Sequence, residues 1–113
     1  MKYYIAADHA GIQIKSFVKE LFEERGHEVE DLWPFTKDRV DYPDYASKVC
    51  KKVLENQGTM GILICGSGLG MSMAANKFGG IRAALCHNEY SARMARKRNI
   101  LMKYYIPAWS AAI

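Results

Sequence analysis

The chain has 113 residues, half of them apolar and a quarter charged. This is the usual size and composition of one globular domain, and it excludes a disordered chain. The net charge of +4 equals the charge of one short basic cluster, Arg93, Arg96, Lys97 and Arg98. A nucleic-acid-binding protein has a broader basic face, and the uncharged stretch 58–76 contains too many glycines and hydroxyls for a membrane helix. We therefore expect neither nucleic acid nor a membrane as partner.

The cysteines and the N-terminus indicate a cytoplasmic protein. Three cysteines without a C-x-x-C pair fit neither a disulfide framework nor a zinc knuckle. A charge at Asp8 comes too early for a signal peptide. No cluster of metal ligands is visible in the sequence, so we expect no metal and no cofactor.

The first half of the chain predicts two strand–helix units. Residues 2–7 are an apolar run typical of a buried strand, and residues 27–33 alternate loosely as a second strand. A second helix is expected to start at Asp41–Tyr42–Pro43, with proline in its first turn, and to end at Gly58. The first helix ends before Gly26 and shows an apolar stripe made of Ile14, Phe17, Val18, Leu21 and Phe22.

The second half repeats this pattern. Residues 60–65 predict a central parallel strand, and a glycine-rich turn at 66–70 leads into a third helical stripe at 71–78. Residues 81–86 predict a fourth strand, Asn88 caps a helix that runs to about Arg98, and residues 100–106 predict a fifth strand. Alternating strands and helices joined by short turns indicate an α/β domain with a parallel sheet covered on both faces.

Polar residues follow three of these strands. Ligands bind at the carboxyl ends of the strands in such sheets. Asp8 and His9 follow the first strand, Cys65 ends the third, and Cys86–His87 ends the fourth. The pair Asp8–His9 fits either a ligand site or a helix cap with a solvated histidine, and His87 fits either a site or a solvated strand end. We interpret His27 as an exposed residue.

The loop from Cys65 to Gly70 favours an anion or a developing oxyanion. Its glycines let backbone N–H groups approach a ligand, and the next helix directs its positive end at the same place. A thiolate is stabilised at a helix start. A dinucleotide loop would need glycine at position 71 or 73, where Met71 and Met73 stand. Taken alone, the loop fits a reactive cysteine and a buried structural thiol about equally.

Together these pieces resemble the ribose-5-phosphate isomerase B family, which also includes the galactose-6-phosphate isomerase subunits. The resemblance runs without gaps from residue 1 to about residue 99. It rests on ADHAG at 7–11, GHEV at 26–29, VDYPDYA at 40–46, GILICGSGLGMS at 61–72, AANK at 74–77, GIRAALC at 80–86 and YSAR at 90–93.

This resemblance implies a Rossmann-like three-layer α/β/α sandwich with a sheet of four to five strands, working as a homodimer or tetramer. It implies metal-free aldose–ketose isomerisation of a sugar phosphate, namely ribose 5-phosphate to ribulose 5-phosphate, through a cis-enediolate. Cys65 would be the base and Ser67 would assist ring opening. The amides of Gly66, Gly68 and Gly70 would hold the enediolate oxygens. Other substrate contacts would be Asp8, His9 on the phosphate, Tyr42 and Asn99.

The tail at residues 100–113 departs from the family. The resemblance would place a histidine where Arg98 stands, followed by a last strand and a long C-terminal helix. Arg98 would supply a phosphate contact but is a poor proton shuttle. We therefore treat 1–113 as a single isomerase domain with an anomalous tail, from a frameshifted or truncated reading, and with low activity. The alternatives are a catalytically impaired sugar-phosphate-binding subunit or remnant, and a plain anion-binding module.

Overall fold

A computed structural model describes residues 1–8, 11–33, 42–65, 69–86, 88–98 and 105–110, with the backbone alone at 33, 42, 96, 98 and 105–110. The strands in this part of the chain are β1 (Lys2–Ala7), β2 (Glu28–Trp33), β3 (Thr59–Cys65), β4 (Arg82–Cys86) and β5 (Tyr105–Ser110). The helices are α1 (Ile12–Glu24), α2 (Tyr42–Glu55), α3 (Leu69–Ala75) and α4 (Glu89–Arg98). Among these described helices, none has the length and apolar character needed to span a bilayer.

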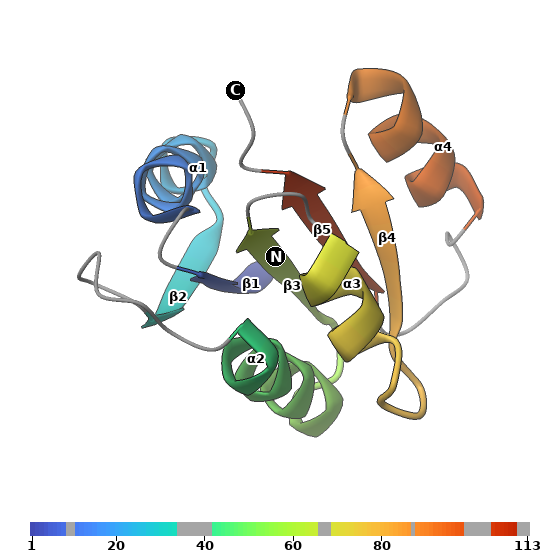
Figure 1. The fold of residues 1–113 in the computed structure, drawn as a ribbon. Helices are drawn as coiled ribbons and strands as arrows, with labels where there is room; N and C mark the ends of the chain where they lie inside the picture. The colour runs from blue at the N-terminus through green and yellow to red at the C-terminus, as the bar shows by residue number, and fades with distance from the viewer. Residues whose placement is uncertain (9–10, 34–41, 66–68, 87, 99–104, 111–113) are drawn as a thin grey trace.

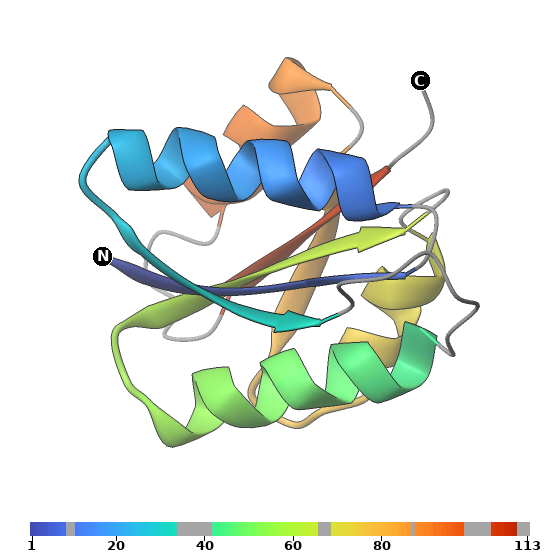
Figure 2. The ribbon, with the colours of Figure 1, turned by 90° about the vertical axis from the view of Figure 1, so that its left-hand side faces the viewer.

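The five strands form one parallel sheet in the order β2-β1-β3-β5-β4. Helices α1 and α4 lie on one face of this sheet, and α2 and α3 lie on the other (Figures 1 and 2). The prediction of a three-layer α/β/α sandwich is confirmed. Because every strand is parallel, all the carboxyl ends lie at one edge.

Two apolar clusters fill the layers between the sheet and its helices. On the α1 side, Ile5, Ile62 and Ile64 pack with Val18 of the helix. On the α2 and α3 side, Leu63 and Cys65 share a cluster with buried residues of both helices. Every residue of β3 is buried, because this strand has a neighbour on each side and helices on each face. Residues 60–65 were predicted as the central strand, and this is confirmed.

The glycine predicted to end the first helix and the asparagine predicted to cap the fourth are both confirmed. Gly26 has φ 85° just after α1, a backbone conformation that favours glycine. The side chain of Asn88 accepts a 2.7 Å hydrogen bond from the backbone N–H of Ser91 and so caps α4.

Three details of the predictions are wrong. Phe17 is 66% exposed, whereas Lys15 is buried on the inner face of α1. His27 is half-buried, and its ring lies edge-on to Tyr3 with a centroid distance of 5.4 Å. The fifth strand spans Tyr105–Ser110 instead of 100–106. It pairs with both β3 and β4, which places Pro107 inside an inner strand. Proline is usually excluded from such strands because it has no N–H group to donate, and here the pairing with two strands outweighs that local preference.

Candidate active site

The ends of β1 and β3 bring two of the predicted site residues together. Ala7 is the register partner of Ile64 across these strands, and the backbone N–H of Asp8 donates a 3.0 Å hydrogen bond to the carbonyl of Ile64. The next residues, Asp8 and Cys65, therefore occupy neighbouring positions at the carboxyl edge, one strand spacing of ~4.8 Å apart. An aspartate and a cysteine from distant parts of the sequence thus stand at neighbouring strand ends, on the edge where ligands bind in this architecture.

Gly11, just before α1, lies close to the end of β3 and is hydrogen-bonded to Asp8. The backbone N–H of Gly11 donates a 3.1 Å hydrogen bond to the carbonyl of Asp8. A Cβ atom on Gly11 would lie 2.8 Å from Cγ2 of Ile64 and 3.1 Å from Cβ of Ala7. Only a residue without a side chain lets α1 begin directly against the end of β3. Steric crowding therefore explains why the ADHAG stretch ends in glycine.

Cys65 is the last residue of β3, and its side chain is 4% exposed. It belongs to the cluster that includes Met71 and Ala75 of α3. Helix α3 starts only four residues later, at Leu69. The strand end and the helix start are therefore close along the chain, and the thiol lies in a nearly dry environment.

The other two cysteines lie in different surroundings. Cys50 is fully buried in α2, where its Sγ lies 3.9 Å from the carbonyl oxygen of Ala75, and burial raises the pKa of its thiol to about 12. Cys86 ends β4 and its Sγ lies 3.5 Å from the carbonyl oxygen of Ala84. Cys50 stays protonated at neutral pH and fits a structural thiol. Cys86 ends β4, which pairs with β5, whereas Cys65 ends the strand that pairs with β1 and so lies next to Asp8.

Several predicted site residues lie outside the described residues or are described only in part. Tyr42 is the first residue of α2 and Arg98 is the last of α4, and only their backbone is described. Gly70 lies in the first turn of α3. The predicted residues outside the described part of the chain are His9, Gly66, Ser67, Gly68, His87 and Asn99.

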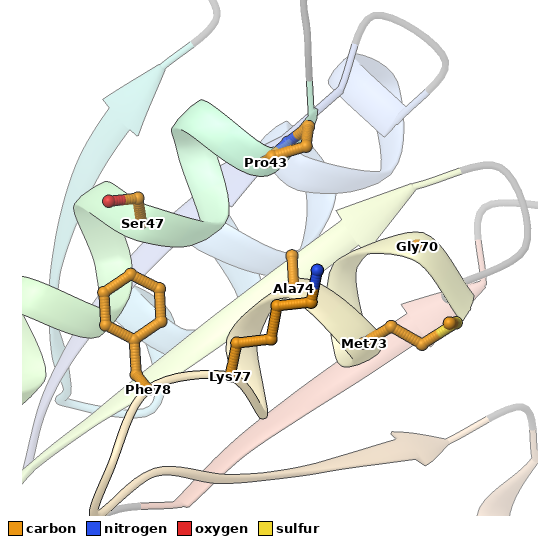
Figure 3. A pocket seen from close by; sticks show the side chains of 7 residues that line it. All are labelled: Pro43, Ser47, Gly70, Met73, Ala74, Lys77 and Phe78. Atoms are coloured by element: carbon orange, nitrogen blue, oxygen red, sulfur yellow. The ribbon is translucent and has the colours of Figure 1, made fainter.

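An open groove of about 270 Å³ runs between α2 and α3. Figure 3 shows the side chains that line it, with the Lys77 amine directed along the groove and the Phe78 ring at its far end. Its other lining residues are Pro43, Ser47, Gly70, Met73 and Ala74. Gly70 is the predicted site residue that this groove shares, so the groove adjoins the start of α3.

The sequence predictions missed an ion pair beneath the carboxyl edge. The Lys15 amine of α1 lies 2.8 Å from a carboxylate oxygen of Asp31 in β2, and the side chains are 1% and 13% exposed. Gly11, Lys15 and Val18 are all buried and follow helical spacing. The sequence offered no signal for this pair, because the burial of Gly11 and Lys15 is visible only in the structure, and the apolar spacing pointed to Phe17 instead.

A second missed contact joins α3 to β4. The side-chain amide of Asn76 donates a 2.9 Å hydrogen bond to the carbonyl of Ala83 and accepts a 2.8 Å hydrogen bond from its N–H. This side chain thereby pairs with the backbone of the edge strand as a neighbouring strand would. It fixes the end of the helix that follows the Cys65 loop.

Comparison with known proteins identifies the relatives of this chain. Ribose-5-phosphate isomerase B of Escherichia coli is 45% identical over 98 residues, which cover 87% of this chain and 66% of that protein. The chain therefore spans about two thirds of the length of this relative.

Solved structures agree with the sequence relatives. Ribose 5-phosphate isomerase B of Thermotoga maritima is similar with a TM-score of 0.85 and 47% identity, over 95% of this chain and 73% of that one. The Mycoplasma genitalium enzyme with bound ribulose 5-phosphate has a TM-score of 0.88 and 38% identity, over 97% of this chain and 72% of that one. The Ribose/Galactose Isomerase sequence profile matches residues 3–102. The resemblance found in the sequence is thus confirmed, and the chain belongs to the ribose/galactose isomerase family.

Proposed function

We propose that this chain isomerises a phosphorylated aldose to the ketose, and that the substrate is ribose 5-phosphate. The observation that carries the proposal is the juxtaposition of Cys65 and Asp8 at the carboxyl edge, in a chain whose relatives are named ribose-5-phosphate isomerase B. One solved relative holds ribulose 5-phosphate, the ketose of this pair.

The reaction needs a base, an acid and a place for negative charge. The thiolate of Cys65 takes the proton from carbon two of the open-chain aldose, and the electrons form a cis-enediolate. That proton returns to carbon one, while the oxygen on carbon one gains a proton and the hydroxyl on carbon two loses one. No electrons leave the substrate, so the ketose forms without any co-reactant.

Residues around the thiol would reduce the barrier of this step. Backbone N–H groups aimed at a developing oxyanion typically contribute about 3 kcal/mol each, and the proposal gives this role to the amides of Gly66, Gly68 and Gly70. Asp8 would accept a hydrogen bond from a sugar hydroxyl. The low exposure of Cys65 strengthens electrostatic interactions with any charge that develops beside it.

The remaining roles complete the proposal. Ser67 assists ring opening, His9 contacts the phosphate, and Tyr42 and Asn99 line the sugar. Arg98 ends α4 and adds a positive charge for the phosphate. The enzyme would work in the cytoplasm as a homodimer or tetramer, with residues 100–113 as an anomalous end of a single domain.

A sugar-phosphate-binding subunit without turnover is the second candidate. The family match ends at residue 102, and Arg98 stands where the resemblance would place a histidine. Arginine stays protonated and cannot exchange a proton with the ring oxygen. This candidate binds the same ligand at the same edge but does not remove the proton from carbon two.

Proton exchange in deuterated water distinguishes these candidates. The parent protein is incubated with ribose 5-phosphate, and loss of the carbon-two proton signal is followed by NMR. We expect Cys65→Ala to lower the exchange rate at least 100-fold, the lower end of the usual loss for a general base. Cys50→Ala is the matched control and should exchange at the parent rate.

Each other outcome has a defined meaning. Exchange that survives in Cys65→Ala refutes the role of this thiol. Binding of ribose 5-phosphate without exchange by the parent favours the second candidate, and absence of both refutes the proposed function.

A further inference from the structure

The inner face of α1 carries a charged side chain at a position where close packing alone would favour an apolar one. Gly11, Lys15 and Val18 are buried at helical spacing, and Lys15 is 1% exposed. The helix still exposes Phe17 to solvent on another face. An ammonium group loses its hydration on burial and is tolerated only with a well-placed counter-charge.

Asp31 of β2 provides that counter-charge at a defined point of the sheet. Its carboxylate oxygen lies 2.8 Å from the Lys15 amine, and its register partner on β1 is Ile5. The register between β1 and β2 shifts immediately after this pair. The ion pair therefore ties α1 to β2 at the last regular rung before the carboxyl edge.

Two contacts thus fix the start of α1 from different sides. Lys15 lies one helical turn after Gly11, and Gly11 packs against Ile64 of β3. Gly11 in turn closes the hydrogen-bonded turn that carries Asp8. The path from Asp31 to Asp8 is therefore short: an ion pair, one turn of helix and the hydrogen bond from Gly11 to Asp8.

We propose that Lys15 and Asp31 are positioning residues that hold the Asp8 turn in register with Cys65. The 2.8 Å ion pair fixes which turn of α1 faces Asp31, and in some proteins a buried polar pair specifies a single arrangement of the elements that it joins. Replacing a buried ion pair by apolar side chains is often neutral or stabilising, so stability alone gives little reason for this pair. The effect on turnover rests on the proposed isomerase function, but the effect on the Asp8 turn does not.

The test compares Lys15→Met/Asp31→Leu with the matched control Lys19→Met/Glu23→Leu. The control removes an exposed ion pair of 3.1 Å on the same helix. Amide hydrogen exchange is measured by NMR at Asp8 and Gly11, whose N–H groups are both hydrogen-bonded. We expect protection at these two amides to fall at least tenfold in the buried-pair variant and to stay unchanged in the control. The amide of Ile5 reports on the core and should not change in either variant.

Turnover provides the second readout. In an active parent, the buried-pair variant should lower kcat for ribose 5-phosphate at least tenfold and change KM less than threefold, because misplacement of reacting groups acts on the reaction geometry. Unchanged protection at Asp8 and Gly11, or an unchanged kcat in an active enzyme, overturns the proposal. If the parent has no turnover but protection falls as expected, the positioning role stands and the proposed function fails. Should the double variant not fold, Lys15→Met alone, which leaves only the more exposed partner Asp31 without its ion pair, is judged by the same criteria.

Discussion

Gly11→Ala tests the steric argument for the Asp8 turn. The backbone at Gly11 has φ −101° and ψ 6°, which alanine adopts without strain, so in the folded state any effect must come from the added methyl group. That methyl would lie 2.8 Å from Cγ2 of Ile64, against a normal carbon–carbon contact of about 3.5 Å or more. Ile64 is fully buried, so its side chain has no free space to move into.

The expected loss of stability follows from two opposing terms. Overpacking a dense core costs about 1–3 kcal/mol. Replacing glycine restricts the unfolded chain and returns about 0.4–1 kcal/mol. Taking the middle of each range, we expect Gly11→Ala to lower the free energy of unfolding by about 1.3 kcal/mol.

Urea unfolding followed by circular dichroism measures this change. The matched control is Gly79→Ala, because a Cβ atom at Gly79 has no atom within 4 Å, and we expect this variant to equal the parent or to gain up to about 1 kcal/mol. The reasoning is refuted if Gly11→Ala is as stable as the parent. Proton exchange on ribose 5-phosphate should also slow in Gly11→Ala, since the turn must move away from β3.

Three other changes test single features of the structure. Gly58→Ala should cost about 1 kcal/mol in urea unfolding, because φ 82° is unfavourable for any other residue even in open space; an unchanged midpoint would contradict this. Asn76→Ala removes both hydrogen bonds to Ala83 and should cost about 1 kcal/mol, the low end for two bonds that water can partly replace. An Asn76→Ala variant as stable as the parent would contradict this expectation. Cys50 has a pKa raised from 9.0 to about 12 by burial. The free energy of unfolding therefore keeps its full value below pH 9, where the thiol is protonated in both states, and falls as the pH rises from 9 towards 12. Between pH 8 and pH 10 the parent should lose about 1.4 kcal/mol more than Cys50→Ala, and parallel pH profiles would show that the thiol is not desolvated.

The sequence by itself determined the order of the elements and the edge at which the chemistry lies. Short apolar runs, helical spacing and the glycine at position 26 are local signals, and β1, β3 and α4 follow them closely. The parallel arrangement places every carboxyl end at one edge, so Asp8 and Cys65 could be expected at the same edge before the strand register was known. The family motifs then added the chemistry that the loop alone left open.

Only the tertiary structure decided which strand neighbours which and which face of a helix is buried. Strand β5 lies between β3 and β4 and is hydrogen-bonded to both. No pattern within residues 100–113 predicts which strands these neighbours are. The buried face of α1 is chosen by its contacts with Asp31 and Ile64, so Lys15 lies inside and Phe17 outside. Periodicity is a property of neighbours along the chain, whereas burial depends on residues that are distant in sequence.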